Sequence, residues 1–246
     1  MALPAPPALF GVVMLLIGLF VCLVSGRHVW RTAAVLRADT VDRLGGVDDG
    51  RLVRVTGTVE AAGSTLTAPF SGVDCVALRP VVEERRPGAL LVPTYVTIHD
   101  PSASVGFAVR TPHGVVSVDA PARTVSLTST VIATVDPDAE PPERIARYER
   151  ETSSLSAETG WRSPPAPIAP MLRAFSIGTR RYSEQRASPG DEVTVAGRVV
   201  DGHLDPLVVS TTTPKGTLRR LSKTSLAGLL VGAFALALGV VLLVAG

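Results

Sequence analysis

The residue in the sequence that is best suited to covalent chemistry is a single cysteine. Cys75 lies in the segment Leu66–Arg86 and is the one cysteine between the two apolar ends of the chain. A thiolate can act as a nucleophile, but the neighbouring Asp74 raises a thiol pKa, and no histidine is adjacent in sequence to serve as a base. Free cysteines are also among the most buried residues. Two interpretations follow, a membrane hydrolase nucleophile and a packed core residue, and the sequence favours packing.

Charged side chains offer two further candidate sites. Glu83 and Glu84 end the same segment, where paired carboxylates would suit acid–base chemistry; a solvated strand end beside arginines is the simpler interpretation. Arg181, Tyr182 and Glu184 form a second group, and Tyr182 and Glu184 share a face if that stretch is extended. Because tyrosine and arginine make good anchors, these three are the first candidates for binding a partner. The alternative is packing plus an edge charge.

Cofactor and metal motifs are missing from the sequence. It contains no phosphate-binding glycine loop, no G-x-S-x-G and no H-E-x-x-H, and its four histidines are scattered without a C-x-x-C. Residues 136–140 imitate a calcium loop, but Pro141 replaces the required glycine and Arg147 the bidentate glutamate. We therefore expect no cofactor and no metal. The formal net charge of +2 gives no basis for nucleic-acid binding.

The region between the apolar ends has the pattern of a β-rich domain. Arg51–Glu60 alternates around Gly57, which suggests a bulge or a close backbone approach, and Gly190–Val199 repeats its V-x-V-x-G-x-V pattern. Further strands are expected at Thr94–His99, Gly106–Arg110, Val115–Asp119 and Thr124–Val135. Glu143–Glu151 predicts a short helix, and residues 153–170 a linker. The related first and last strands suggest a small barrel-like or sandwich-like fold with one or two short helices.

Two uncharged apolar runs, Ala8–Ser25 and Leu226–Ala245, predict transmembrane helices on either side of this domain. A cleaved signal peptide is the alternative for the first run, although no basic residue precedes it. The resulting organisation is a first helix over residues 1–26, a β-rich domain over residues 27–218 and a second helix over residues 219–246. Arginines and a lysine flank the inner ends of both runs, which predicts a multi-pass protein of the cell membrane with a cytoplasmic domain and both termini outside.

Glycines in the second run suggest close helix packing. Gly228 and Gly232 form G-x-x-x-G, and Gly239 follows seven residues later. Small residues allow helix backbones to approach, either with the first run or between copies in a homo-oligomer. Glycine is also simply frequent in membrane helices, and both interpretations stay open.

The loop and strand of Leu66–Arg86 resemble the GIDE domain, the module between two transmembrane helices in membrane ubiquitin ligases of the MULAN/MAPL type. A small-residue loop with Pro-Phe-Ser-Gly, a cysteine and a strand ending in glutamates carry the first half of the resemblance. Arg-Tyr-x-Glu followed by Ser-Pro-Gly-Asp and V-x-V-x-G carries the second. Arg110 departs from the family's usual aspartate. The matched positions, which we expect to be structural, are Pro69, Ser71, Gly72, Cys75, Glu83, Gly114, Pro189, Gly190 and Gly197.

Three functions compete. The first is a non-enzymatic interaction or sensing domain at a lipid bilayer, with an unidentified protein partner. The second, implied by the resemblance, is a role in ubiquitin ligation; a RING domain needs about eight zinc ligands, and none follows the second apolar run, so we expect a prokaryotic form without autonomous ligase activity. The third is a membrane hydrolase or peptidase that uses Cys75 or a serine. The sequence favours the first.

Overall fold

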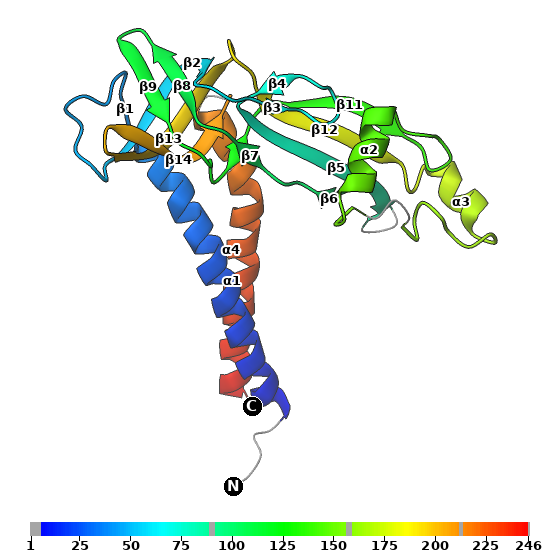
Figure 1. Ribbon diagram of the computed structural model, residues 1–246. Coiled ribbons are helices and arrows are strands. Elements are labelled where there is room, and N and C mark those ends of the chain that lie inside the picture. The colour runs from blue at the N-terminus through cyan, green and yellow to red at the C-terminus, as the bar shows by residue number, and fades with distance from the viewer. Residues whose placement is uncertain (1–5, 89–91, 156–158, 212–213, 246) are drawn as a thin grey trace. The chain divides into compact units, whose positions relative to one another are not determined.

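The protein is mainly β, with a small barrel-like sheet and four helices in its described residues (Figure 1). This computed structural model describes residues 6–88, 92–155, 159–211 and 214–245, without the side chains of residues 6–9, 27–37, 214–227 and 244–245. The chain divides into two compact units, one made of Met1–Ala38 with Thr213–Gly246 and the other of Asp39–Thr212.

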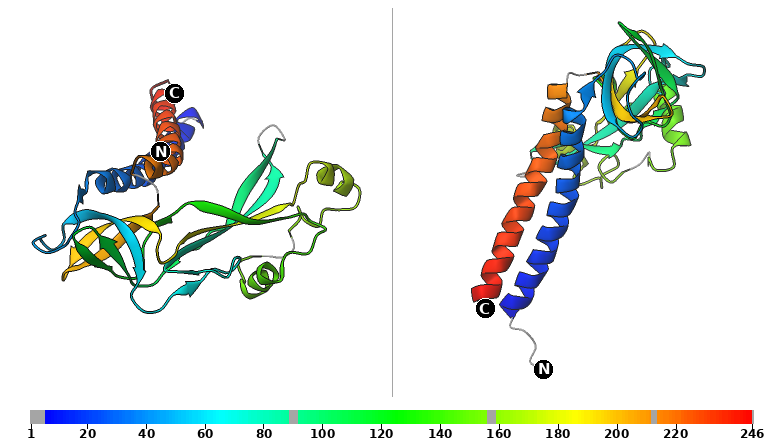
Figure 2. Two further views of the ribbon diagram at one scale, coloured as in Figure 1. Left: turned by 90° about the horizontal axis from the view of Figure 1, so that it is seen from above. Right: turned by 90° about the vertical axis from the view of Figure 1, so that its left-hand side faces the viewer.

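The first unit is a pair of long helices, α1 (Pro6–Arg37) and α4 (Pro214–Ala245), which lie side by side in the right-hand view of Figure 2. Glycines line their contact. A Cβ atom on Gly232 would lie 2.7 Å from the Cys22 sulfur, and one on Gly239 would lie 2.9 Å from the Gly11 carbonyl oxygen. Gly228 faces Ser25 in the same way. The three glycines of α4 thus allow close approach to α1 of the same chain.

Within the described residues, neither α1 nor α4 offers an apolar stretch long enough to cross a membrane. A spanning helix needs roughly 20 consecutive apolar residues, whereas side chains are described for residues 10–26 of α1 and 228–243 of α4. This finding corrects the expected transmembrane helices, the multi-pass cell-membrane location and the cytoplasmic orientation. The basic residues on which the orientation was based, Arg27, Arg31, Arg37, Arg219, Arg220 and Lys223, lie outside the residues with described side chains.

Five strands of the second unit close into a barrel. They follow one another around it in the order β2 (Leu52–Ala61), β8 (Phe107–Thr111), β9 (Gly114–Val118), β14 (His203–Ser210) and β13 (Glu192–Val200), and β13 returns to β2. Only the β9–β14 pairing is parallel, through Leu204 and Val118. A five-stranded, partly open Greek-key barrel is the architecture of OB-type folds. Short strands β1 (Asp39–Thr40) and β10 (Val125–Ser126) add to its edges.

Alternating valines fill this barrel because successive strand residues point to opposite faces. Val53 and Val55 of β2 and Val195 of β13 are fully buried. Two glycines bring the strands together. A Cβ atom on Gly57 would lie 2.1 Å from the Arg110 carbonyl oxygen of β8, and one on Gly197 would lie 2.2 Å from the Asp205 carbonyl oxygen of β14. The repeated pattern of β2 and β13 therefore marks two close backbone approaches.

A second sheet is assembled from two insertions into the barrel. Between β2 and β8 the chain forms β3 (Leu66–Thr67), β4 (Asp74–Cys75), β5 (Ala77–Pro87), β6 (Pro93–His99) and β7 (Ala103–Ser104). Between β9 and β13, after β10, it forms β11 (Ser129–Val135), α2 (Glu143–Glu151), α3 (Ala169–Ala174) and β12 (Arg180–Ala187). The strand order β11-β12-β5-β6 joins the insertions at β5 and β12, which pair antiparallel from Ala77↔Ala187 to Glu84↔Arg180. The segment expected as a linker thus includes turns and the start of α3.

Replacing Gly57 with alanine tests the close approach in the barrel. We expect Gly57→Ala to lower the free energy of unfolding by about 3 kcal/mol, because the added methyl group meets a backbone carbonyl that cannot move alone. Gly45→Ala is the matched control, since a Cβ atom there meets nothing within 4 Å. Urea unfolding of both full-length variants measures the difference, and equal stabilities would contradict the assignment.

Candidate functional site

The two halves of the family-like motif meet at a buried carboxylate. Glu184 of β12 is fully buried, and its carboxylate accepts hydrogen bonds from the backbone N–H groups of Phe70 (2.7 Å) and Ser71 (3.1 Å). The Ser71 hydroxyl donates a further bond to the other oxygen, at 2.5 Å. These donors lie in the Pro69–Val73 loop, which precedes β4. Glu184 therefore fixes this loop onto the face of the second sheet.

Two arginines complete the surroundings of this carboxylate and its loop. Arg186 lies 3.3 Å from Glu184 and is itself partly buried, so the charge of Glu184 is paired as well as hydrogen-bonded. A buried carboxylate without such partners would be costly. Gly72 has a left-handed φ of +76°, and a Cβ atom on it would lie 2.7 Å from the Arg144 guanidinium carbon. The conformation and the space under α2 both favour glycine at this turn.

Tyr182 lies on the same strand face and packs in an aromatic cluster. Its ring meets Phe70 edge-on, with centroids 5.6 Å apart, and Phe70 meets Tyr148 of α2 at 5.2 Å. The Tyr182 hydroxyl donates to Glu149 at 2.6 Å. Burial, followed by this hydrogen bond, raises the Tyr182 pKa well above its usual range. Tyr182 thus joins the loop, the sheet and α2, and it has no exposed surface.

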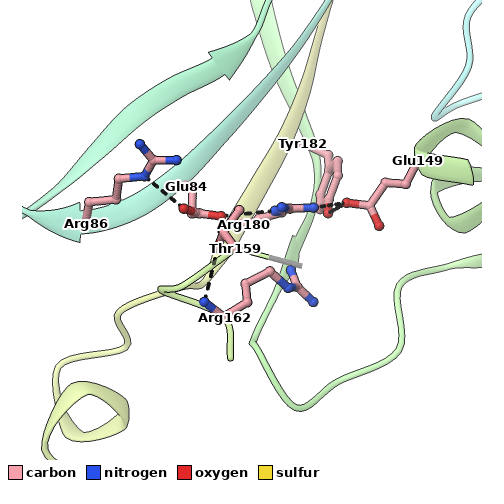
Figure 3. A network of polar contacts seen from close by, with 7 residues as sticks. All are labelled: Glu84, Arg86, Glu149, Thr159, Arg162, Arg180 and Tyr182. Atoms are coloured by element: carbon pink, nitrogen blue, oxygen red, sulfur yellow. Dashed lines mark hydrogen bonds and ion pairs between the residues drawn. The ribbon is translucent and has the colours of Figure 1, made fainter. Parts of the chain in front are cut away.

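A buried polar network occupies the other end of this face (Figure 3). Arg180 and Glu84 are fully buried and lie 3.4 Å apart. Arg180 also contacts Glu149 at 2.5 Å. Burial by itself lowers the Arg180 pKa, but the hydrogen bond and charge of Glu149 outweigh it and raise that pKa. Glu84 further accepts from Arg86 (2.8 Å) and from the Thr159 hydroxyl (2.9 Å).

Arg180, Glu149 and Thr159 were not predicted as site residues from the sequence. Helical spacing offered a signal for Glu149, because it lies four residues after Ile145, the buried residue of α2, and therefore on the same face. No comparable signal marks Thr159. Glu84 was expected at a solvated strand end, and this expectation was wrong: Glu84 is fully buried and lies against Arg180.

Arg181 and Glu83 lie on the opposite face of the second sheet. Arg181 stacks over the Tyr95 ring, with its guanidinium carbon 4.2 Å from the centroid, and its Nη2 lies 2.7 Å from Glu83. The three residues predicted to bind a partner are therefore divided between two faces, with only Arg181 partly exposed. Tyr182 and Glu184 can influence a binding surface only through the loop and helix that they hold.

Cys75 has the environment of a packed thiol. It is fully buried, and its Sγ lies 3.5 Å from the Leu66 carbonyl oxygen. Burial, and then the negative charge of Glu184, raise the Cys75 pKa to about 11. Activated cysteines require the opposite shift. One serine–histidine contact is present, from Ser154 Oγ to His99 Nδ1 at 3.3 Å, and the other ring nitrogen of His99, Nε2, is bound to the Tyr148 hydroxyl.

The remaining motif positions shape turns. Gly114 begins β9 directly after the turn from β8. Gly190 has a φ of +95° beside Pro189, and its N–H donates to the Val59 carbonyl at 2.9 Å, which joins this turn to the barrel. No group of three or more His, Cys, Asp and Glu side chains in the described part of the chain is arranged to hold a metal ion.

Glu184→Gln tests the role of the buried carboxylate. An amide cannot accept all of the donors that Glu184 binds, so we expect the free energy of unfolding to fall by about 3 kcal/mol. Native-state alkylation of Cys75, which follows the same loop in β4 and is fully buried, should accelerate. Glu60→Gln removes an exposed ion pair with Arg110 and should cost under about 1 kcal/mol. Equal effects from the two variants would contradict this role.

The raised pKa of Cys75 predicts a pH dependence of stability. A thiol with an unperturbed pKa of 9.0 and a folded pKa of about 11 binds its proton more tightly in the folded state. Its stabilising contribution is therefore complete below pH 9 and is lost as the pH rises toward 11. We expect urea unfolding across this range to give a steeper decline for the parent protein than for Cys75→Ala. Parallel declines would show that Cys75 titrates normally.

No protein-family model, no curated protein and no solved structure matches the chain.

Proposed function

We propose that the Asp39–Thr212 unit is a non-enzymatic binding module that engages a protein partner through an exposed apolar surface at α3. This α3 surface consists of four large side chains, each between 37% and 59% exposed: Trp161, Ile168, Met171 and Phe175. Exposed apolar clusters on folded domains commonly mark interaction sites. Aromatic and methionine side chains are also enriched at the centres of protein interfaces.

The spacing of these residues supports a common surface. Helical spacing places three of these side chains on one side of α3. Ile168 directly precedes the helix, Met171 lies three residues later within it, and Phe175 directly follows it, four residues after Met171. Leu172 points into the protein and is buried. The backbone of Trp161 lies against the far end of the same segment, since a Cβ atom on Gly178 would be 2.4 Å from the Trp161 carbonyl oxygen.

The segment that carries the α3 surface is firmly attached to the second sheet. Gly178 donates to the Arg85 carbonyl and Arg85 donates to the Thr179 carbonyl, both at 2.8 Å. At the other end, Thr159 donates to the buried Glu84. Thr179 also bonds Asp136 through its hydroxyl, at 2.8 Å. A surface held at both ends loses little conformational entropy when it binds, which favours affinity.

The GIDE resemblance is part of this proposal. According to this proposal, the Pro69–Val73 loop and Glu184 form the structural core of an interaction domain and are not a reactive centre. Their mutual hydrogen bonds support a structural role for both motif halves. The burial and raised pKa of Cys75 argue against the hydrolase alternative, and no contact in the described residues specifically favours ubiquitin transfer.

Loss of the apolar anchors tests the proposed function. We expect Met171→Ser/Phe175→Ser in the full-length tagged protein to reduce the amount of a co-purifying partner by about tenfold or more, because central apolar anchors carry most of the binding energy. Val115→Ser/Val200→Ser is the matched control, since both valines are similarly exposed on the barrel. Quantitative mass spectrometry measures the partner. Retention by the α3 variant, or equal loss in both, would contradict the proposal.

A further inference from the structure

The second sheet ends in a strand whose outer side is unpaired. The strand order β11-β12-β5-β6 places β6 at one border, and no strand in the described part of the chain pairs with its other side (Figure 1). A free edge exposes backbone N–H and C=O groups that another strand can bind. Folded proteins commonly protect such edges with charged side chains, whereas β6 carries none from Pro93 to Ile98, and its one proline is its first residue. The strand β6 is therefore open to pairing with a further strand.

The hydrogen bonds of β5 identify which backbone groups of β6 face outward. The Arg85 N–H donates to the Thr179 carbonyl, and the Arg85 carbonyl accepts from the Gly178 N–H, both at 2.8 Å, so the backbone of Arg85 faces away from β6. Tyr95 is the β6 residue opposite Arg85. In an antiparallel ladder, pairs that exchange hydrogen bonds alternate with pairs that do not. The N–H and C=O groups of Tyr95 therefore point to the free edge, and those of Thr97, two residues later, do the same.

The opposite border of the sheet, β11, is less suited to pairing. Its ladder with β12 shifts register between Val131 and Ala133, in the middle of the strand. A bulge bends a strand and increases its twist, which is one way in which proteins protect an edge. The ladder of β6 with β5 is regular from Pro93 to Thr97, and its register shift falls only at the end, before His99. The longer regular edge of the second sheet is therefore that of β6.

We propose that β6 pairs antiparallel with β6 of a second copy of the chain, with the two-fold axis at Val96. In this pairing Tyr95 of one copy lies opposite Thr97 of the other, and the two residues exchange both backbone hydrogen bonds. The two Val96 side chains, each 37% exposed in the single chain, meet at the axis. On the same face, Thr94 of one copy lies opposite Ile98 of the other. The α3 surface contributes no residue to this interface, so the inference is independent of the proposed function.

The side chains of β6 favour a second copy over the strand of another protein. A residue on a two-fold axis faces itself, so a charged residue there would repel its copy, whereas valine packs against it. Aromatic and β-branched residues that lie opposite one another also stabilise antiparallel strands. A different protein would find no charge in β6 for specific recognition. Two charges of the adjoining strand β5 are already paired, Glu83 with Arg181 and Glu84 with Arg86.

A cysteine placed at the axis tests the register of this pairing. The Cα atoms of opposite residues that do not exchange hydrogen bonds are about 4.5 Å apart, within the range of a disulfide. In full-length protein with Cys22→Ala as the background, we expect the oxidant diamide to link Val96→Cys into a dimer in extracts of the producing cells. Cys75 is fully buried and stays in every variant.

Two further cysteine variants are the matched controls. Thr94→Cys lies on the same exposed edge, but the two copies of this residue would be four positions apart along the ladder, about 13 Å, which is too far for a disulfide. Val131→Cys is exposed on the opposite border, β11. Absence of the Val96→Cys dimer, equal linking of either control, or a disulfide from Val96→Cys to a different protein would overturn the inference.

Amide hydrogen exchange of the unaltered full-length protein is a second test. We expect the Tyr95 and Thr97 N–H groups to be protected at high protein concentration, where the second copy covers them, and to exchange about tenfold faster or more after dilution. The N–H groups of Thr94 and Val96 face β5 and should stay protected at both concentrations, which also reports that the sheet is intact. Val96→Lys places two like charges at the axis and should remove the dependence on concentration. Rapid exchange of Tyr95 and Thr97 at every concentration would refute the dimer.

Discussion

A buried carboxylate has to find donors, and Glu184 finds them in a loop 113 and 114 residues away along the chain. The same face of β12 presents Arg180 and Tyr182 at the two preceding alternate positions. Arg180 contacts Glu84 and Glu149, and Tyr182 contacts Glu149 and Phe70. One strand face therefore holds the loop, α2 and, through Glu84, the turn that begins at Thr159.

The barrel and the second sheet of this unit are stabilised by different kinds of interaction. The barrel is closed by valine packing and by two glycines that admit neighbouring backbones. The second sheet also packs an apolar cluster, but it buries in addition ions that must be paired to be tolerated. The hydrophobic effect is non-directional, whereas ion pairs and hydrogen bonds require particular partners in a particular geometry. The polar face is accordingly the part that positions the α3 surface, and the barrel provides the base from which both insertions emerge.

Local pattern was enough to predict most strands of this fold, because alternation and turn residues act over a few positions. The helix at Glu143–Glu151 and the close approach at Gly57 were also predicted from local sequence. Strand β14 was missed because Pro206 interrupts its pattern; the proline is tolerated where β13 shifts register opposite it. The ion pairs of Arg180 were beyond local sequence, since they join elements from both insertions. The two predicted transmembrane helices were wrong: no helix in the described part of the chain is long and apolar enough to cross a membrane.

The pairing of β2 with β13 joins Thr56 to Thr194, 138 residues later. The ladder between β5 and β12 is also long-range, so both sheets depend on strands made near the end of the unit. At synthesis rates of about 5 to 20 residues per second, an emerging β2 waits roughly 7 to 28 s for its partner. During that interval its valines have no barrel to enter. Because both sheets need strands from the end of the unit, we expect them to assemble only after β13 has been synthesised.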